Sequence, residues 1–255
     1  MKLATWNVNS LRARKGHLLR WLGEADVDVV CLQELKHVDK HFPADELAAA
    51  GYPHCAWDGQ PTYNGVAIVS RLPLSDVQKG MADDEDDPQK RVIAATIEGV
   101  RVYGLYVPNG QRVGSDKFRY KLRWLDRFRR ELDRYDPSTK LAVVGDFNIA
   151  PDDNDVWDPF RLDGTLLCHP EERRRLQQWL DWGLWDSYRE KNRFGADFTW
   201  WDYRQMGWER NHGIRIDHVL LSRSLRDTLV DVRVDRHVRG WDTPSDHAPV
   251  VATFG

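Results

Sequence analysis

Carboxylate and amide side chains follow several short apolar runs in this chain of 255 residues. Asn7 and Asn9 follow the first run, Glu34 follows the second, and Asp146 and Asn148 follow a later one. A carboxylate at the end of a buried strand is partly removed from water, which is costly unless a cation or a hydrogen-bond donor meets it. Such oxygen ligands suit a hard cation such as Mg²⁺ or Mn²⁺, and the chain lacks the paired Cys and His spacing of a zinc site.

Two more acidic positions stand near the C-terminal apolar runs. Asp217 begins one run, and Ser245-Asp246-His247 precedes the last. An aspartate beside a histidine can orient a neighbouring imidazole and keep it charged against a phosphate. Gly145, directly before Asp146, allows a tight turn that presents the following polar side chains together. The combination indicates chemistry at a phosphate.

Each motif also has a structural interpretation. Asn7 after Trp6 fits an ordinary turn, Glu34 fits a helix cap or a solvated strand end, and Asp246 fits an Asp-turn. For the Gly-Asp-Phe-Asn segment at 145–148 the two interpretations are evenly balanced. The presence of all the motifs in one chain favours the catalytic interpretation.

The elements that must position these residues alternate between strand and helix. Short apolar runs predict strands at 3–6, 27–33, 65–70, 92–97, 101–107, 141–144, 215–221 and 249–254. Apolar residues at helical spacing predict helices over 11–22, from Ser115 to about Tyr135, and over 170–182. No linker divides the chain, so we expect one α/β domain over residues 1–255.

The composition is that of an ordinary globular protein, with 41% hydrophobic and 30% charged residues. No apolar run approaches the roughly 20 residues that cross a bilayer. The three cysteines are too few and scattered for a disulfide framework, which predicts a cytoplasmic protein. The net charge of −3 gives no overall positive field, although 37 Lys and Arg residues could still gather on one face. Nothing indicates more than a monomer.

Seven segments, in this order, resemble the exonuclease III family of apurinic/apyrimidinic endonucleases, within the endonuclease/exonuclease/phosphatase superfamily. They are WNVNSLRAR (6–14), CLQELK (31–36), YVPNG (106–110), GDFNIAP (145–151), FTWWDYR (198–204), GIRIDH (213–218) and SDHAP (245–249). The resemblance implies a four-layered α/β sandwich, in which two mixed β-sheets pack face to face with helices outside. The active site would lie where strand ends of both sheets meet.

The resemblance also implies roles for individual residues. Glu34, supported by Asn7, would be a principal Mg²⁺ ligand, and Asp146 would orient or deprotonate the attacking water. His247, held by Asp246, would contact the scissile phosphate. The implied catalytic set is Tyr106, Asp146, Asn148, Asp217, Asp246 and His247, and the implied metal set is Asn7, Glu34, Asp146, Asn148, Asp246 and His247. The number of metal ions, and whether Asp146 acts as base or ligand, stay open.

The implied activity is that of a Mg²⁺-dependent phosphodiesterase of base excision repair, with Mn²⁺ as a possible substitute. It would cleave double-stranded DNA 5′ to abasic sites and trim nucleotides or blocking groups from 3′ ends. Expected DNA contacts are Arg12, Asn109, Lys117, Lys121 and Trp200. Trp200 could instead be ordinary core, and surface cations could simply aid solubility. Two other interpretations are a catalytically inactive regulator on the same fold, disfavoured by the complete catalytic set, and a lipid or inositol phosphatase, disfavoured by the DNA-branch motifs.

Overall fold

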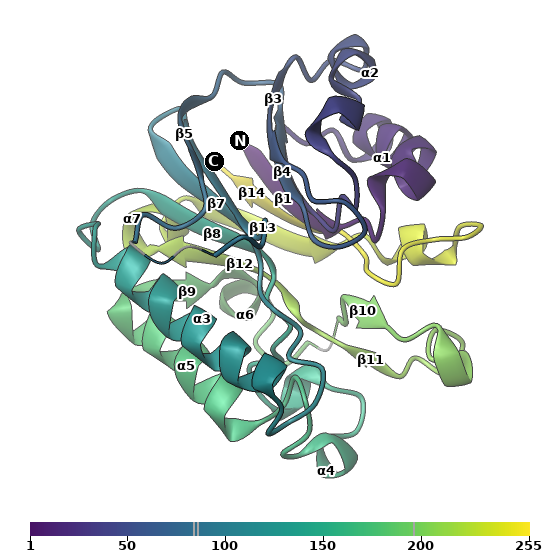
Figure 1. The fold of residues 1–255 in the computed structure, drawn as a ribbon, viewed down its shortest axis with the longest axis vertical. Helices are drawn as coiled ribbons and strands as arrows, with labels where there is room; N and C mark the ends of the chain where they lie inside the picture. Colours follow the sequence, from purple (N-terminus) through teal and green to yellow (C-terminus); the bar gives the residue numbers. More distant parts are fainter. Residues whose placement is uncertain (84, 86, 196) are drawn as a thin grey trace.

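Two six-stranded sheets form the centre of the computed structural model, which describes residues 1–83, 85, 87–195 and 197–255. The first sheet has the order β13-β14-β1-β2-β4-β3 and the second β5-β6-β7-β8-β12-β9. Both are mixed, since β1 pairs parallel to β2 and β7 parallel to β8, whereas the other pairings are antiparallel. Figure 1 shows the two sheets facing each other.

The strands of the first sheet are β1 (Lys2–Asn7), β2 (Val29–Gln33), β3 (His54–Asp58), β4 (Val66–Ser70), β13 (Leu229–Val234) and β14 (Val250–Phe254). Those of the second are β5 (Ser75–Lys79), β6 (Val92–Ile97), β7 (Val100–Tyr106), β8 (Leu141–Asp146), β9 (Leu184–Asp186) and β12 (Asp217–Ser222). A small separate hairpin consists of β10 (Trp200–Trp201) and β11 (Gly213–Ile214).

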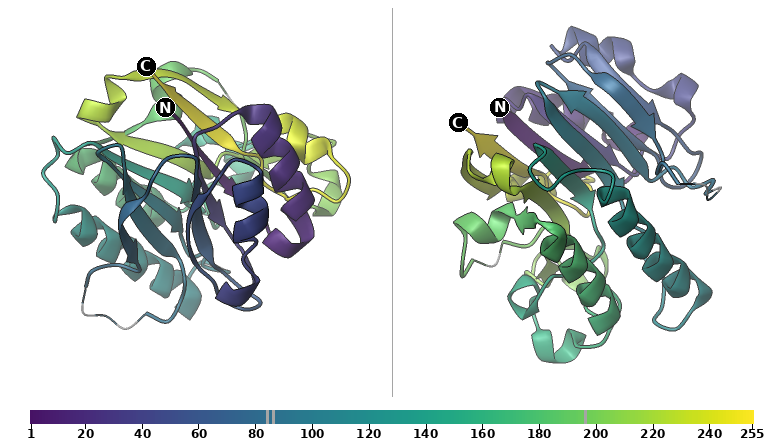
Figure 2. Two further views of the ribbon diagram at one scale, coloured as in Figure 1. Left: turned by 90° about the horizontal axis from the view of Figure 1, so that it is seen from above. Right: turned by 90° about the vertical axis from the view of Figure 1, so that its left-hand side faces the viewer.

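Helices cover the outer face of each sheet (Figures 1 and 2). The longer ones are α1 (Leu11–Ala25), α3 (Asp116–Leu132) and α5 (Pro170–Trp182). The shorter ones are α2 (Ala44–Ala49), α4 (Pro159–Leu162), α6 (Ser187–Lys191) and α7 (Arg223–Arg226), with 3-10 turns at Asp39–His41, Asp153–Asp155, Arg204–Met206 and Arg236–Gly240. None of the helices in the described ranges is long and apolar enough to cross a membrane.

The layers follow from the two-residue period of a strand, which sends successive side chains to opposite faces. In β2, Val29 and Cys31 pack between the two sheets, whereas Val30 and Leu32 pack toward α1. In the second sheet, the side chains on the outer face pack against α3 and α5. Three apolar clusters therefore alternate with the layers, and the expected four-layered α/β sandwich is confirmed.

Most predicted elements are present, with shifted ends. The strand expected from residue 215 begins at Asp217, because the backbone N–H of Arg215 donates to Asp155 O instead of joining the ladder. The last helical stripe residue, Tyr135, lies beyond the end of α3 at Leu132. Six strands of the described ranges were not predicted, namely β3, β5, β9 and β13 in the two large sheets and β10 and β11 in the small hairpin. β5 shows why: its residues are mostly exposed and polar, so it carries no apolar signal.

Candidate active site

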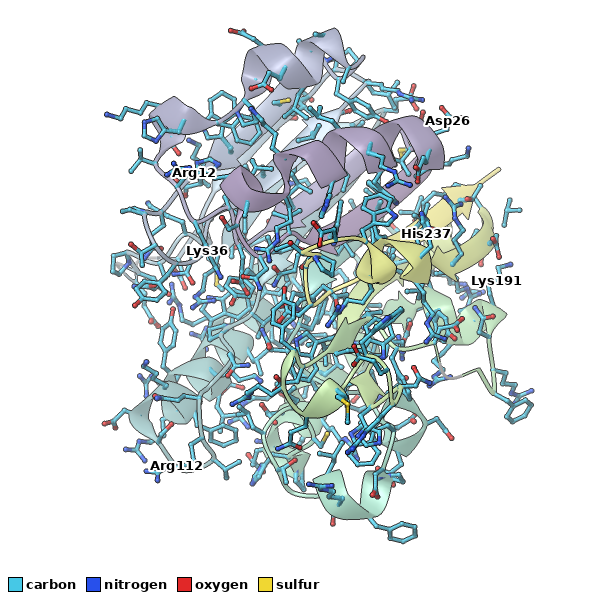
Figure 3. All side chains as sticks on the ribbon, turned by 90° about the vertical axis from the view of Figure 1, so that its right-hand side faces the viewer. Arg12, Asp26, Lys36, Arg112, Lys191 and His237 are labelled. Atoms are coloured by element: carbon cyan, nitrogen blue, oxygen red, sulfur yellow. The ribbon has the colours of Figure 1, made fainter. Side chains whose placement is uncertain are left out.

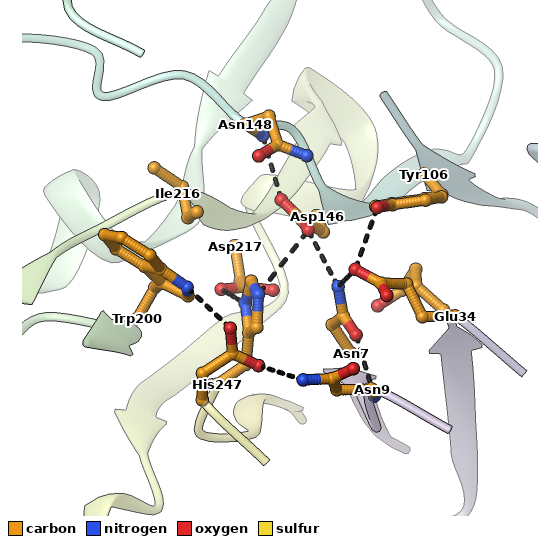
Figure 4. A network of polar contacts seen from close by, with 12 residues as sticks. Asn7, Asn9, Glu34, Tyr106, Asp146, Asn148, Trp200, Ile216, Asp217 and His247 are labelled. Carbon is orange, nitrogen blue, oxygen red and sulfur yellow. Dashed lines mark hydrogen bonds and ion pairs between the residues drawn. The ribbon is translucent and has the colours of Figure 1, made fainter. Parts of the chain in front are cut away.

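The ends of five strands bring the predicted polar residues to one edge of the sandwich. Asn7 ends β1 beside Gln33, so Glu34 follows at the same edge of the first sheet. In the second sheet Asp146 pairs with Tyr106 on one side and with Asp217 on the other. Figure 4 shows these side chains pointing toward one another from both sheets.

Asn7 links the carboxylates of the two sheets. Its Nδ2 donates to Glu34 Oε1 and to Asp146 Oδ2, both at 2.9 Å. Tyr106 donates its hydroxyl to Glu34 Oε1 at 2.8 Å (Figure 4). Because one amide nitrogen meets both acids, Glu34 and Asp146 are held next to each other even though they belong to different sheets.

His247 is held by Asp217, which corrects the expectation that Asp246 holds it. Its Nδ1 lies 2.9 Å from Asp217 Oδ2, and its Nε2 lies 3.7 Å from Asp146 Oδ2. Asp246 instead accepts hydrogen bonds from Asn9 Nδ2 at 2.9 Å and Trp200 Nε1 at 3.0 Å. The reason is local: Asp246 lies in a bend directly before His247, and Asn9 and Trp200 hold its carboxylate.

Burial and charge together set the protonation of this group. Burial raises the pKa of Asp146 to about 7, opposed by the His247 charge and reinforced by Asp217. Burial alone would lower the pKa of His247, but the negative charges of Asp217 and Asp146 outweigh it and raise that pKa to about 10. His247 is therefore an imidazolium at neutral pH, and Asp146 is poised to exchange a proton there.

The pKa of Glu34 is shifted in the opposite direction to that of Asp146. Burial would raise its pKa, yet the Lys36 charge and hydrogen bonds from Asn7, Lys36 and Tyr106 together lower it. Lys36 Nζ lies 2.6 Å from Glu34 Oε2 and donates to Asn9 Oδ1 at 2.5 Å. Glu34 thus stays ionised, and Tyr106, whose pKa burial raises well above its usual value, stays a neutral donor.

Gly145 is required because the neighbouring strand leaves no space for a side chain. A Cβ atom at this position would lie 2.0 Å from Leu105 O on the parallel neighbour β7. Asn148, two residues after Asp146, adopts a left-handed φ of 51° and donates its backbone N–H to Asp146 Oδ1 at 2.9 Å. The segment therefore fixes Asp146 through its backbone.

Asn148 itself turns its side chain away from the carboxylates. Its Oδ1 accepts from Asn109 Nδ2 at 3.0 Å, and its Nδ2 donates to Val107 O at 3.0 Å. Asn148 therefore positions the Asn109 loop. Its amide oxygen and both carboxylate oxygens of Asp246 already accept hydrogen bonds from protein side chains.

The expected DNA contacts lie in four different places. Lys121 is fully buried, and its ammonium donates to Asn148 O at 2.7 Å and pairs with Glu172, so the prediction that it contacts DNA is wrong. Its place in the helical pattern suggested an exposed basic face, but α5 covers that part of α3. Asn109 and Lys117 are exposed and line a cleft that also contains Tyr106.

Arg12 is exposed and lines a separate cleft of about 930 Å³ together with Lys36. Figure 3 shows Arg12, Lys36 and Arg112 along one side of the molecule. Cations therefore flank the site on the side of Lys36, as a polyanionic ligand would require.

Trp200 lines the central pocket and Trp201 does not. The pocket has a volume of about 630 Å³, with Glu34, Asp146 and His247 among its lining residues. Trp200 is half-buried in its wall, whereas Trp201 is completely buried in the adjacent core. Because adjacent side chains of a strand point to opposite faces, only one of the two can face the pocket.

Several lining residues carried no signal in the sequence. Trp157 stacks on His212 with ring centroids 3.7 Å apart, and Arg161 stands beside them in the same pocket. Trp157 and His212 come from irregular segments far apart in the chain and Arg161 comes from the one-turn helix α4, and neither periodicity nor a motif marks any of them. Arg91 was also missed; its guanidinium lies over the Tyr106 ring, 4.7 Å from the centroid.

The donor set fits a hard divalent cation. Asp146, Asp217 and His247 offer ligand atoms within 4.8 Å of one another, and Asp217 Oδ1 is buried without a hydrogen-bond partner among the described residues. His247 is an imidazolium with carboxylates at both nitrogens, so it is a poor ligand. Carboxylate oxygens of Glu34, Asp146 and Asp217, with the Asn7 amide beside them, are the ligands that Mg²⁺ prefers.

Comparisons with known proteins agree with this geometry. The profile of the Endonuclease/Exonuclease/phosphatase family matches residues 4–247. Exodeoxyribonuclease III of Haemophilus influenzae is 36% identical over the full length of both chains. Two Neisseria structures, described as a 3′-5′ exonuclease and as a 3′ phosphatase bound to a product DNA hairpin, are 47% and 46% identical with TM-scores of 0.94 and 0.95, covering 100% of this chain and 99% of theirs. An AP endonuclease from Archaeoglobus fulgidus is 36% identical with the same coverage and a TM-score of 0.95.

Proposed function

The chain belongs to the endonuclease/exonuclease/phosphatase family, and from this we propose that it is a DNA-repair nuclease that hydrolyses phosphate esters at DNA 3′ ends. The observation that carries the proposal is the group of Glu34, Asp146 and His247 that lines one pocket, with Asp217 buried beside His247. The 3′-end preference is supported by the Neisseria relatives, which are more similar in sequence than the Archaeoglobus AP endonuclease.

The site residues divide the chemistry between them. Asp146, which the Asn7 side chain and the Asn148 backbone hold in place, accepts the proton of the attacking water. The His247 imidazolium, fixed by Asp217, stabilises the negative charge that develops on the phosphate. Tyr106 donates its neutral hydroxyl to Glu34 and so fixes that carboxylate. Asn148 holds the Asn109 side chain in place, where it is available to contact the DNA strand.

Mg²⁺ would be held by Glu34 and Asp146, beside the Asn7 amide, with Asp217 as a further candidate. When bound, it supplies Lewis-acid neutralisation of phosphate charge. The support is the carboxylate donor set and the unpartnered Asp217 oxygen.

Incision 5′ to abasic sites is the second candidate activity. It is supported by the whole-chain match to the Archaeoglobus AP endonuclease and by the half-buried Trp200 in the pocket wall. An apolar wall can accept a sugar that lacks its base. The partner for either activity is double-stranded DNA.

The test compares three labelled DNA substrates: a duplex with a recessed 3′ end, one with a 3′-phosphate, and one with an internal abasic-site analogue. We expect Mg²⁺-dependent release from the 3′ ends and none in EDTA. Asp146→Asn should slow turnover at least a hundredfold, because general-base catalysis contributes about 10²–10⁴, while DNA affinity persists.

Asp163→Asn, which removes an exposed carboxylate outside the pocket, is the matched control and should retain full activity. Cleavage only at the abasic site would contradict the proposed 3′-end activity and support incision 5′ to abasic sites instead. Tight DNA binding without cleavage of any substrate would indicate the inactive regulator instead.

A further inference from the structure

One wall of the catalytic pocket is a pair of stacked rings that no step of the proposed chemistry uses. Trp157, Arg161 and His212 all line the pocket that contains Asp146 and His247. The indole of Trp157 and the imidazole of His212 are nearly parallel, with an interplanar angle of 10° and ring centroids 3.7 Å apart. The Arg161 guanidinium lies 5.5 Å from the centre of the Trp157 ring. Flat π surface and a cation therefore occur together in the wall of the pocket that holds the reacting groups.

The polar atoms of this wall are available to a ligand. Within the described ranges, Trp157 Nε1, the ring nitrogens of His212 and the Arg161 guanidinium make no hydrogen bond to the protein, and only the backbone N–H groups of these residues are engaged. By contrast, Trp200 Nε1, in the same pocket, donates to Asp246 at 3.0 Å. The wall thus combines ring surface with donors that still need an acceptor.

The two rings are held in place by their backbones. Trp157 N donates to Gly213 O at 3.1 Å, and Gly213 directly follows His212, so this bond ties the two segments together. The Trp157 ring packs against the apolar cluster that contains Trp201, and His212 N donates to Gly207 O at 2.8 Å. Binding does not have to order a wall that the fold already orders, which favours affinity.

The depth of the catalytic group brings a nucleotide to this wall. Asp146 is 1% exposed and His247 is 4% exposed. A phosphate therefore meets them only inside the pocket, and the nucleotide joined to it must leave its base pair to follow. The pocket volume of about 630 Å³ lies within the range of cavities that hold small organic ligands. A base that has left the duplex stack needs another π surface, and aromatic side chains supply one for any base.

The chemistry of the wall suits a base better than a sugar that lacks one. A nucleobase has a flat π face and carries hydrogen-bond acceptors on its edges, which match parallel rings and free N–H donors. A deoxyribose without its base has no such face. The Trp200 side chain, whose Nε1 is already engaged by Asp246, offers apolar surface only.

We propose that Trp157 and His212 form the site for the base of the 3′-terminal nucleotide, and that Arg161 binds a phosphate of the same strand. This inference rests on the proposed 3′-end activity and names the part of its substrate that the pocket selects: a terminal nucleotide that carries its base. It accounts together for the stacked rings, the free donors and the depth of the catalytic group.

The experiment measures the affinity of the protein for two labelled duplexes in EDTA, so that turnover does not interfere. Each duplex ends in one unpaired 3′ nucleotide, which carries adenine in the first and is a base-less tetrahydrofuran analogue in the second. For the wild type we expect about tenfold tighter binding of the adenine duplex, within the range for single base–aromatic stacks. His212→Ala should remove most of this preference and leave the affinity for the base-less duplex unchanged. His212→Phe, which keeps a ring, should retain the preference.

His54→Ala is the matched control, because His54 is also half-buried but lies on β3 and does not line the catalytic pocket; it should behave as wild type. Arg161→Gln should lower the slope of log affinity against log salt by about 0.7 on both duplexes, the value for one phosphate of a single strand. An unchanged slope would remove Arg161 from the site.

Three results would overturn the base site alone: a wild type that binds both duplexes equally, a preference for adenine that survives in His212→Ala, or a His212→Ala variant that binds both duplexes equally more weakly than the wild type. A wild type that neither binds these duplexes nor processes 3′ ends with Mg²⁺ would overturn the proposed function as well.

Discussion

At the scale of single residues, the site depends on one carboxylate whose charge is unfavourable in the folded protein. Burial first, then the neighbouring charges of Asp217 and Glu34, raise the pKa of Asp146, although His247 and Asn7 partly offset them. A group that stays protonated in the fold at pH values where the unfolded chain has released its proton makes folding stability fall as pH rises. Function and stability therefore conflict at this position.

The conflict predicts a pH-dependent effect of Asp146→Asn on stability. With the folded pKa near 7 and the unfolded value near 3.9, the contribution of Asp146 to wild-type stability should fall between about pH 4 and 7, and the variant should lack that fall. We expect Asn to gain on the order of 1–4 kcal/mol over wild type by pH 8, at about 1.4 kcal/mol per pKa unit. Urea unfolding in EDTA at several pH values measures it. A difference that stays constant with pH would contradict the assigned shift.

At the scale of elements, a buried ion pair ties two helices to the two active-site loops. Lys121 on α3 pairs with Glu172 on α5, and its ammonium also donates to the carbonyls of Asn109 and Asn148. Glu172 Oε2 in turn accepts from His169 N at 3.1 Å, which caps α5. Burial lowers the pKa of Lys121, and the Glu172 charge counteracts this. The ion pair thus connects α3 and α5 to the loops of Asn109 and Asn148 beside the active site.

Removing one partner of this ion pair should lower the free energy of unfolding. Lys121→Met leaves the Glu172 carboxylate buried without a cation, and we expect a loss of roughly 3–5 kcal/mol in unfolding free energy. The double variant Lys121→Met/Glu172→Gln should recover part of it, which a double-mutant cycle measures. Arg129→Ala, which breaks the exposed pair with Asp133, should cost at most about 1 kcal/mol. Equal costs for the two single variants would show that burial does not matter here.

At the scale of the whole molecule, the two sheets share one core. The apolar cluster between them draws Leu3 and Val29 from the first sheet and Val102 and Val144 from the second, all without exposed surface. The active site also needs both sheets, because Glu34 comes from one and Asp146 from the other. Neither sheet can leave the other without exposing this cluster and dispersing the site.

The shared core predicts cooperative unfolding of residues 1–255 as a single domain. We expect one calorimetric transition, with the calorimetric and van't Hoff enthalpies equal, and loss of enzyme activity at the same temperature. Light scattering should give the mass of a monomer. Two resolved transitions, or activity that disappears well before the main transition, would contradict the single-domain assignment.

The sequence by itself determined the buried strands and much of the site, and its resemblance to a family implied the layers. Short apolar runs define buried strands, and polar residues at their ends must collect where strands end, because the ends of neighbouring strands lie at the sheet edge. Seven motifs then indicated the family, and Asn7, Glu34, Tyr106, Asp146, Asp217 and His247 do converge.

Only the tertiary structure decided which of these residues touch. That Asp217 and not Asp246 holds His247 depends on the direction of side chains in a segment without regular periodicity. Lys121 is buried because α5, about 50 residues later, packs over it. The periodicity of one helix does not show which other element packs against it. Trp157 and His212 come from loops and Arg161 from the one-turn helix α4, whose positions are set by what they pack against and not by local spacing.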